Sequence, residues 1–560
     1  MTYSSLSKPF LFDSQLKYRL KLAKKRLENY PVDSMNFLMM DLERPKLRTR
    51  HAHWCTYDLT GRTLFFYALA EGIDGEHITR LPELYERIMN NRRKSGTFGN
   101  SFEYMEAEPE TAALLGSHFL SGLVNYYALT GDMRALNAAQ EGAQFMLNKW
   151  DTCINKIKDP SSPNHVECWI VEAFAELYRE TREEKYMNAI RQITYECVGQ
   201  MDKAHSHGYM TTLRGILKAS IYAEDNDLAE FVKIRRQEIL DAGCITPNGD
   251  VSEIFPVSFR NEGCSIADWI MLNLYYAYRF DDSQAYAIAE HSLWNALYFN
   301  QFVTGGFGHR YLSDHGYHTY IEEAWWCCTP NAGMCLTEVA RHAVTMKNGV
   351  LKLNFYLPGR YTIPSPEGEI TVTVTTRYPI SPQTIVKVSG TDKDIEIRVP
   401  ECVKGYTCRR IDTGLGYELH LDGKIGHTIE KQNRGTIVKY GPLVIAPMIY
   451  MWDTYDNSTE GTTVPTGYAH DNQLSTDIIL AAGEPDADGF YHFRHDPLPE
   501  WSVFEEGEMA AISGGEVASA YVPVLLPNGE NIDMFMQPLC GATTNLTLMD
   551  ILVDFKIDRD

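Results

Sequence analysis

The chain has 560 residues, which is too long for one ordinary hydrophobic core, so we expect two or three domains. Hydrophobic residues make up 44% of it and charged residues 22%, the composition of a soluble globular protein. The formal net charge of -22 argues against nucleic acid or an anionic membrane surface as a partner.

No targeting or membrane segment is visible in the sequence. Residues 1–15 lack a cationic stretch followed by an apolar run, so we expect no signal peptide. No run of about 18 apolar residues is present that would span a membrane. The 12 cysteines have no framework spacing and therefore predict reduced thiols. Together these features predict a cytoplasmic protein.

The first 347 residues carry apolar side chains at every third or fourth position, the period of amphipathic helices. The predicted helices are 16–30, 62–72, 82–91, 112–129, 133–150, 166–181, 184–201, 209–223, 228–242, 265–280, 283–300 and 331–346.

A helical hairpin recurs within this region. Segments 127–138 and 178–189 resemble each other, and segment 276–287 is a weaker third copy. Tyr67 and Tyr222 end helices in similar settings, so the period is roughly 50 residues. We expect a closed (α/α)6 barrel over residues 1–347, with an open solenoid of helix pairs as the alternative.

From residue 349 the apolar period changes from helical to two, which is typical of strands in an all-β sandwich. The predicted strands are 351–356, 369–375, 383–388, 394–399, 417–421, 436–445, 518–526 and 547–555. We therefore predict an α+β multidomain fold, in which the helical barrel is followed by an antiparallel β-sandwich at 348–450 and a second β-rich region at 451–560.

Two short segments place a glutamate and three cysteines at predicted helix starts. Cys327 and Cys328 precede Thr-Pro-Asn, a helix-start sequence whose positive end lowers the pKa of nearby thiols. Glu262 and Cys264 are two residues apart, so in an extended segment both leave the same face. One carboxylate and three thiolates suit a tetrahedral Zn²⁺ site. The simpler interpretation is buried packing, because either segment alone occurs more often in that role.

With these segments, residues 100 to 350 resemble glycoside hydrolase family 127, retaining β-L-arabinofuranosidases with a zinc-bound cysteine nucleophile. Glu262-Gly-Cys264 is similar to the Glu-x-Cys pair of that family, and Cys327-Cys328-Thr-Pro-Asn to its Cys-Cys-Pro-Pro-Asn segment. The resemblance implies that Glu262, Cys264, Cys327 and Cys328 hold Zn²⁺ and that Cys327 is the nucleophile. It extends to the β region only in architecture.

The resemblance also implies a general acid/base glutamate upstream of the zinc ligands. Segment 241–253 is similar to the turn that carries it, which favours Glu253. The interval from Glu253 to Glu262 is shorter than in the family, so Asp250 and Glu322 stay open as alternatives. A carboxyl group in this role needs a raised pKa beside the leaving oxygen.

Four further residues are candidates for sugar binding. His118, His165 and His207 match histidines that line the barrel of the family, although lone histidines at helix starts are as often structural. Trp326 could stack on a sugar face, with core packing as the equal alternative. A further family histidine is missing where Thr111 stands, which leaves the exact sugar open.

These observations predict a zinc-dependent retaining exo-glycosidase that releases L-arabinofuranose from β-L-arabinofuranosides, or a related sugar from small oligosaccharides. One alternative is a sugar epimerase or isomerase of (α/α)6 type, which would use histidine and glutamate bases without zinc thiolates. Another is a non-catalytic carbohydrate-binding protein with a structural zinc. The sequence does not decide whether the chain forms a homodimer.

Overall fold

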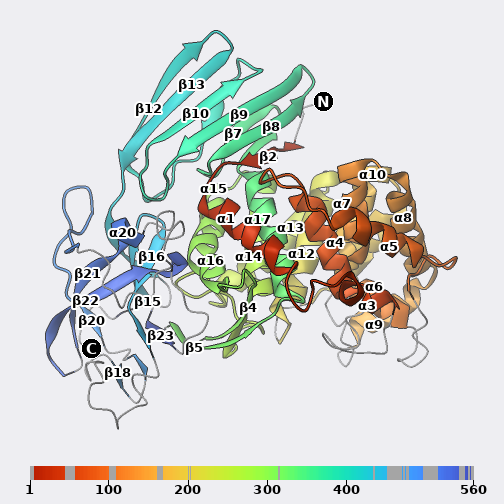
Figure 1. The fold of residues 1–560 in the computed structure, drawn as a ribbon, viewed down its shortest axis with the longest axis horizontal. Coiled ribbons are helices and arrows are strands. Elements are labelled where there is room, and N and C mark those ends of the chain that lie inside the picture. The colour runs from red at the N-terminus through yellow and green to blue at the C-terminus, as the bar shows by residue number, and fades with distance from the viewer. Residues whose placement is uncertain are drawn as a thin grey trace.

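The structure is a computed structural model that describes residues 5–43, 57–99, 109–159, 168–199, 201, 203–312, 316–432, 435–450, 469–470, 473–474, 478–495, 515–526, 528–541, 549–552 and 555. The chain forms a helical part with several β-sheets packed beside it, a multidomain α+β architecture (Figure 1). Within these ranges no helix combines the length and the apolar character that crossing a membrane requires.

Six helices form a closed inner ring: α4 (Asp58–Ala70), α7 (Phe119–Thr130), α10 (Ile170–Thr181), α12 (Ser206–Tyr222), α14 (Gly263–Phe280) and α17 (Cys328–His342). Each packs against the next, and α17 packs back on α4. Almost every residue of α12 and α14 is buried, on all sides of the helix. Helices buried all round are core elements, so the ring is the centre of the helical part.

Each inner helix has an outer partner that buries only one stripe. The outer helices are α5 (Leu81–Asn90) on α4, α8 (Met133–Asn148) on α7, α11 (Glu184–Glu196) on α10, α13 (Asn226–Asp241) on α12, α15 (Ser283–Ser292) on α14 and α1 (Gln15–Arg26) on α17. Shorter helices fill the connections: α2 (Met35–Leu38), α3 (Met40–Glu43), α6 (Pro109–Leu115), α9 (Trp150–Lys158), a π-helical turn at Leu293–Leu297 and α16 (Tyr298–Asn300).

Several predicted helices are shorter than expected, such as 16–30, which ends at Arg26, and 184–201, which ends at Glu196. Two others differ more. The helix expected at 112–129 is two helices, α6 and α7, because the chain breaks at Gly116-Ser-His118. The helix expected at 331–346 begins three residues earlier, at Cys328, and ends at His342. Residues Val344–Lys347 form strand β6 instead, because strand pairing outweighs a helical pattern where β-branched Val344 and Thr345 follow the helix end.

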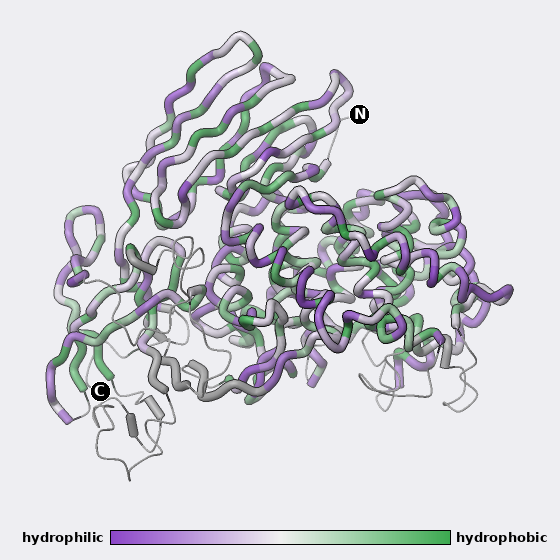
Figure 2. The backbone as a smooth tube through the Cα atoms, in the orientation of Figure 1, coloured by the Kyte–Doolittle hydropathy of each residue, from purple (hydrophilic) through white to green (hydrophobic). Residues whose placement is uncertain are grey.

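Two sheets lie above the helical part in Figure 1. A four-stranded sheet has the order β1 (Ser5–Leu6), β6, β7 (Val350–Leu353), β11 (Ile395–Ile397). A six-stranded sheet has the order β12 (Lys404–Thr413), β13 (Gly416–Lys424), β10 (Thr384–Ser389), β9 (Gly368–Thr376), β8 (Gly359–Ser365), β2 (Lys8–Leu11). Hydrophilic and hydrophobic residues alternate along its strands, as expected for one buried face (Figure 2). The expectation of purely antiparallel pairing was wrong at β11, which runs parallel to β7.

A third sheet contains β14 (His427–Gln432), β15 (Gly435–Tyr440), β16 (Leu443–Ala446), β22 (Asn531–Pro538), β21 (Ala520–Leu525) and β20 (Ile479–Leu480). It joins chain segments on both sides of residue 450. A small two-stranded sheet, β18 (Ala469–His470) with β19 (Gln473–Leu474), the short helix α20 (Gly515–Ala518) and a 3-10 turn at Leu539–Gly541 complete this part. The boundaries proposed at residues 347 and 450 stay a prediction.

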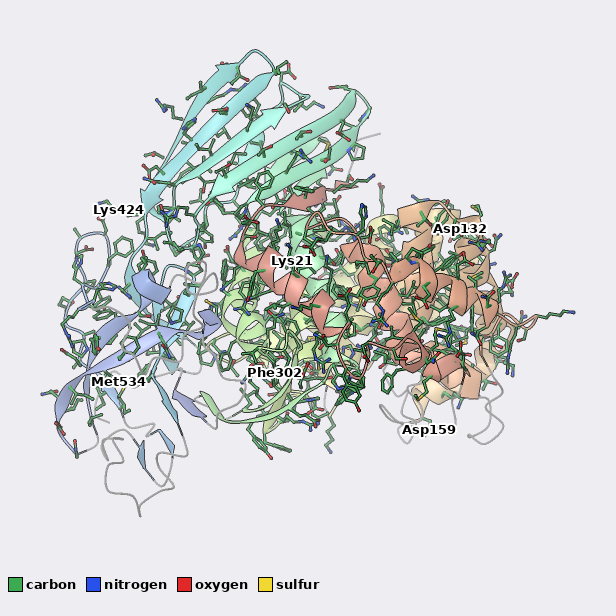
Figure 3. All side chains as sticks on the ribbon, in the orientation of Figure 1. Lys21, Asp132, Asp159, Phe302, Lys424 and Met534 are labelled. Carbon is green, nitrogen blue, oxygen red and sulfur yellow. The ribbon has the colours of Figure 1, made fainter. Side chains whose placement is uncertain are left out.

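One further sheet borders the helical ring, and of its strands the sequence predicted only β23, within 547–555. Its order is β17 (Met448–Tyr450), β23 (Met549–Leu552), β5 (Gly316–Glu323), β4 (Gly308–Leu312), β3 (Arg260–Glu262). Strand β4 is fixed by Arg310, whose guanidinium stacks on Phe299 and on Phe302, the latter labelled in Figure 3. This sheet delivers Glu262 and the segment before Cys327 to the helix starts.

Candidate metal centre and active site

The inner helices begin at one end of the ring, and their first residues contact one another there. The residue that precedes each inner helix is Tyr57, His118, Trp169, His205, Glu262 or Cys327, and none of these side chains caps its helix. By contrast, Ser14, Asp132, Asp225 and Asp282 cap outer helices by accepting hydrogen bonds from backbone N–H groups. The uncapped inner ends therefore favour negative charge at this end of the ring.

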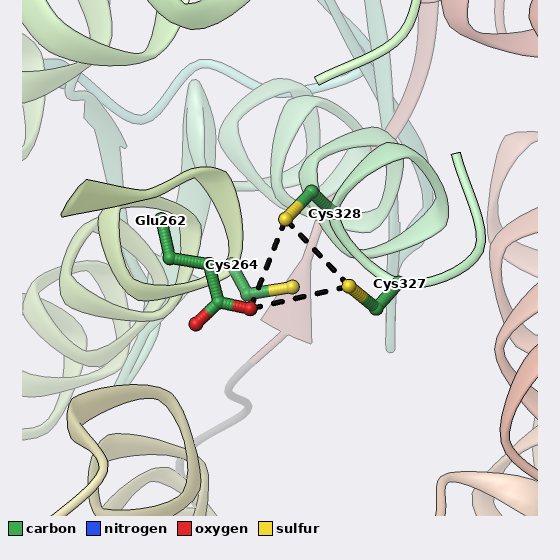
Figure 4. Close-up of side chains that lie close together, drawn as sticks. All are labelled: Glu262, Cys264, Cys327 and Cys328. Atoms are coloured by element: carbon green, nitrogen blue, oxygen red, sulfur yellow. Dashed lines mark hydrogen bonds between the residues drawn. The ribbon is translucent and has the colours of Figure 1, made fainter. Parts of the chain in front are cut away.

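Glu262, Cys264, Cys327 and Cys328 lie together at this end, with one donor atom of each within 4.8 Å of the others (Figure 4). The Cys327 and Cys328 sulfurs are 3.7 Å apart, and they lie 4.0 Å and 3.8 Å from Glu262 Oε1. A disulfide would bring two sulfurs to about 2.05 Å. Four donors placed tetrahedrally at about 2.3 Å from zinc are about 3.8 Å apart, so the observed spacing fits such an ion.

The four side chains meet because two helix starts abut. Glu262 is extended, at φ −142° and ψ 133°, and the chain turns into α14 at Gly263. A Cβ atom on Gly263 would lie 2.7 Å from Asn300 Oδ1 and 3.3 Å from Cys328 Cβ, so only glycine permits this approach. The spacing of Glu262 and Cys264 predicted that both side chains would leave the same face of an extended segment, and this prediction was wrong. Cys264 lies in the first helical turn.

With protein atoms alone around them, the cysteine thiols have pKa values that are set mainly by burial. Burial, reinforced by the neighbouring sulfurs, raises the pKa of Cys264 well above its ordinary value, and burial does the same for Cys328. This outweighs the lowering expected from the helix starts. A cluster of deprotonated sulfurs therefore requires a compensating cation, which is what a divalent metal supplies.

Two basic residues contact the cluster from other helices. His205 Nε2 lies 3.0 Å from Glu262 Oε2. Burial would raise the pKa of Glu262, but His205 and the other nearby histidines outweigh burial and hold that pKa well below its ordinary value. Arg62, which is fully buried, places Nη1 at 3.8 Å from Cys264 Sγ and Nη2 at 3.0 Å from His207 Nε2. Burial disfavours its charge, yet Asp58 and the sulfurs of Cys264 and Cys327 keep the Arg62 pKa well above its ordinary value.

A buried network of charged residues continues from the cluster into the ring. His207 Nδ1 bonds to Asp268, which also pairs with Arg214. Arg214 pairs in turn with Glu172, at 3.0 Å and 2.8 Å. Lys218 links Glu172 and Glu176 at 2.6 Å and 3.1 Å. Helices α10, α12 and α14 are thus held in one register beneath the cluster.

The residues predicted to bind sugar have different surroundings. His207 is buried between Arg62 and Asp268. His118 is fully buried and stacks on Trp169 at 5.1 Å, and burial lowers its pKa to about 4. Trp326 is half-buried, with its ring 5.1 Å from that of Trp325 in an edge-on contact. His165 lies outside the described residues.

The three acid/base candidates also differ. Glu253 lies with His205 and Glu262 in a second group whose donor atoms are within 4.8 Å, and it forms an ion pair with Arg260. Asp250 is fully buried and accepts hydrogen bonds from Asn261 at 2.5 Å and from the Val251 backbone at 2.6 Å, so it holds its own loop. Glu322 is half exposed and lies 3.8 Å from His309.

Sequence reasoning missed Arg62, His205, Trp169 and Asp268. His205 had a signal, because His205-Ser-His207 places two histidines at one helix start, but only His207 was chosen. Arg62 had none, since 202 positions separate it from Cys264 and only the ring closure joins α4 to α14. Long-range proximity of this kind leaves no local pattern in a sequence.

Comparisons with known proteins show what this chain is similar to. Residues 85–329 match the family model described as "Beta-L-arabinofuranosidase, GH127 catalytic domain". Over these residues the chain resembles the catalytic domain of glycoside hydrolase family 127. It is therefore a glycoside hydrolase, an enzyme that cleaves O-glycosidic bonds. The family model spans Glu253 and ends just after Cys328.

Solved structures match over almost the whole length. A GH127 β-arabinofuranosidase is 14% identical with a TM-score of 0.69, covering 99% of this chain and 98% of its own. A GH127 β-L-arabinofuranosidase from Geobacillus stearothermophilus T6 is 13% identical with a TM-score of 0.68, covering 98% of this chain and 100% of its own. At such identities the likeness establishes the fold of this chain. No curated protein sequence matches it.

Proposed function

We propose that this chain is a retaining exo-glycosidase that releases L-arabinofuranose from β-L-arabinofuranosides, with Zn²⁺ held by Glu262, Cys264, Cys327 and Cys328. The observation that carries the proposal is the close approach of these four donors, all within 4.8 Å of one another, at two abutting helix starts. The inner and outer helices around them are proposed to be an (α/α)6 barrel, which the closure of α17 on α4 supports. The sugar itself is taken from what similar structures are named for.

Cys327 is the proposed nucleophile. It precedes α17 and is 3% exposed, whereas Cys264 and Cys328 are 0% exposed, so it is the cysteine of the cluster nearest to solvent. A bound zinc ion would keep its sulfur deprotonated at neutral pH. The thiolate attacks the anomeric carbon as the bond to the leaving oxygen breaks, which leaves the sugar on Cys327.

Glu253 is the proposed acid/base, because its carboxyl group lies beside Glu262 and His205 rather than in the buried loop of Asp250. Glu253 donates its proton to the leaving oxygen. It then takes a proton from water, whose oxygen displaces the Cys327 sulfur at the anomeric carbon. Two displacements at one carbon retain its configuration.

The sugar contacts are proposed as His207, His165 and Trp326. His118 is fully buried beneath Trp169, so we propose that it orients the Trp169 ring and that this ring faces the sugar. The Arg62 guanidinium lies over the Trp169 ring, 4.5 Å from the ring centre. The substrate is therefore proposed to enter where the inner helices begin.

Zinc content tests the metal centre. The wild-type protein, purified without added metal, is expected to hold about one zinc per chain, and Cys264→Ser is expected to lose it, because a tetrahedral site with three ligands binds zinc far more weakly. Atomic absorption measures both. Cys335→Ser is the matched control, since Cys335 is equally buried in α17 but is no ligand, and it should keep its zinc.

If the wild-type protein held no zinc, the cysteines would be interpreted as packing residues. In that case the epimerase hypothesis would be preferred, and assays for sugar epimerisation would replace the hydrolase assays. With zinc present, a panel of methyl and aryl L-arabinofuranosides then identifies the sugar. Zinc together with no hydrolysis of any glycoside would favour a structural metal in a carbohydrate-binding protein.

The leaving group identifies the general acid. Glu253→Gln is expected to lower kcat/KM on methyl β-L-arabinofuranoside by about 10²- to 10⁴-fold, because methanol needs protonation as it departs. On the 4-nitrophenyl glycoside the loss in the first step should be much smaller, because that phenolate leaves without a proton. Glu322→Gln is the matched comparison and should affect both substrates alike. If Glu322→Gln instead lost activity mainly on the methyl glycoside, and Glu253→Gln affected both substrates alike, the general acid would be Glu322.

A further inference from the structure

Two exposed aromatic rings lie beside the acid/base candidates. Phe259 is 68% exposed and Tyr311 is 40% exposed, with ring centres 5.9 Å apart and planes tilted by 33°. Val257 and Ile254, 53% and 37% exposed, lie on the same loop as Phe259. Aromatic side chains that are exposed side by side do not belong to the buried core. A contiguous apolar patch of this kind marks a binding site.

The strand register connects this pair to the zinc candidate. On the antiparallel strands β3 and β4, Glu262 lies opposite His309 and Arg260 lies opposite Tyr311. Opposite residues, and residues two apart on one strand, point to the same face of a sheet. The face that presents Glu262 to the cluster therefore continues through Arg260 to Tyr311.

Glu253 lies between the two ends of this face. Its carboxylate pairs with Arg260 on one side and belongs to the group with Glu262 on the other. Successive same-face positions on a strand are about 6.6 Å apart, so the aromatic pair lies farther from the cluster than the acid does. The Phe259 carbonyl accepts a hydrogen bond from the Leu312 backbone at 2.8 Å, which holds Phe259 beside β4, and its ring contacts that of Tyr311.

We propose that Phe259 and Tyr311 form the binding site for the leaving group, and that they select substrates in which the released arabinofuranose is linked to a pyranose sugar. The inference rests on the proposed function. A sugar bound between the cluster and Glu253 has its glycosidic oxygen at Glu253, so the next unit extends along the face toward Tyr311. A pyranose presents a flat apolar face of C–H groups to aromatic rings, and Tyr311 adds a hydroxyl group for its polar edge.

The patch is continuous with the proposed active site, and this indicates that its ligand is part of the substrate. A second copy of the chain would need a patch of several hundred Å², and it would cover Arg260 and the proposed path of the leaving group. The two charged residues Arg260 and Glu253 next to the rings match the hydroxyl groups of a sugar, which donate and accept hydrogen bonds, better than an apolar protein surface.

The test compares two substrates with the same arabinofuranosyl unit. For the double variant Phe259→Ala and Tyr311→Ala, kcat/KM on β-L-arabinofuranosyl-xylopyranose is expected to fall about tenfold, mainly through KM, because each lost ring removes apolar contact. On methyl β-L-arabinofuranoside, which has no second ring, kcat/KM should not change. Tyr195→Ala, a ring 56% exposed on α11, is the matched control and should change neither.

The other outcomes contradict the proposal in distinguishable ways. Equal values for the variant and wild type on the disaccharide, or an equal fall on both substrates, overturns the leaving-group site while the proposed hydrolase stands. Unchanged kinetics with a smaller sedimentation coefficient for the double variant would assign the rings to an interface between copies. Wild-type protein that hydrolyses neither substrate overturns the proposed function, and this inference with it.

Discussion

Replacing Cys327 with alanine is expected to lower kcat/KM on β-L-arabinofuranosides by about 10⁴-fold or more, because the sulfur that bonds to the sugar is gone. The side chain is nearly buried at the start of α17, and alanine is compatible with that position, so the fold should persist. Steady-state kinetics at saturating zinc measure the loss. The zinc content of the variant is determined in the same preparation, so that loss of the metal is separated from loss of the nucleophile.

Cys328→Ala separates the two roles of a cysteine in this cluster. Cys328 is as close to Glu262 as Cys327 is, so both variants remove one proposed ligand. At saturating zinc Cys328→Ala should recover much of its activity, whereas Cys327→Ala should not. Acid quenching of wild type during turnover should leave one pentosyl unit on the peptide that contains Cys327. Full activity of Cys327→Ala would refute the nucleophile assignment.

Replacing Arg214 with methionine is expected to destabilise the helical part by about 3–5 kcal/mol, because two buried carboxylates would lose the arginine that they share. Arg214 is 1% exposed and pairs with Glu172 and Asp268 on two neighbouring inner helices. Burial disfavours its charge, but those two carboxylates raise its pKa above the ordinary value. Urea unfolding followed by circular dichroism at 222 nm measures the change.

Arg134→Met is the matched control for that measurement. Arg134 also pairs with two carboxylates, Glu86 and Asp132, but on the surface, where its side chain is 56% exposed. Water and salt screen such pairs, so the unfolding midpoint should not change measurably. If Arg214→Met unfolded at the wild-type midpoint, the buried network would not be what holds α10, α12 and α14 in register.

The sequence by itself determined the elements whose signals are local. The helical and strand periods separated the helical part from the sheets, and the recurring hairpin indicated pairs of helices. The two segments around Cys264 and Cys328 were found as motifs because each is contiguous at a helix start. Their meeting also followed from resemblance, since nothing in the spacing of Cys264 and Cys327 along the chain requires it.

Only the tertiary structure decided what surrounds those motifs. Arg62 reaches Cys264 because α4 and α14 lie in one closed ring, and His205 reaches Glu262 because α12 begins beside α14. Strands β3 and β4 escaped the sequence analysis because they are short, and β5 because it pairs with β23, more than two hundred residues away. Local patterns record which face of an element is apolar. Contacts between elements far apart in the chain depend on packing free energy summed over the whole fold, which no single segment contains.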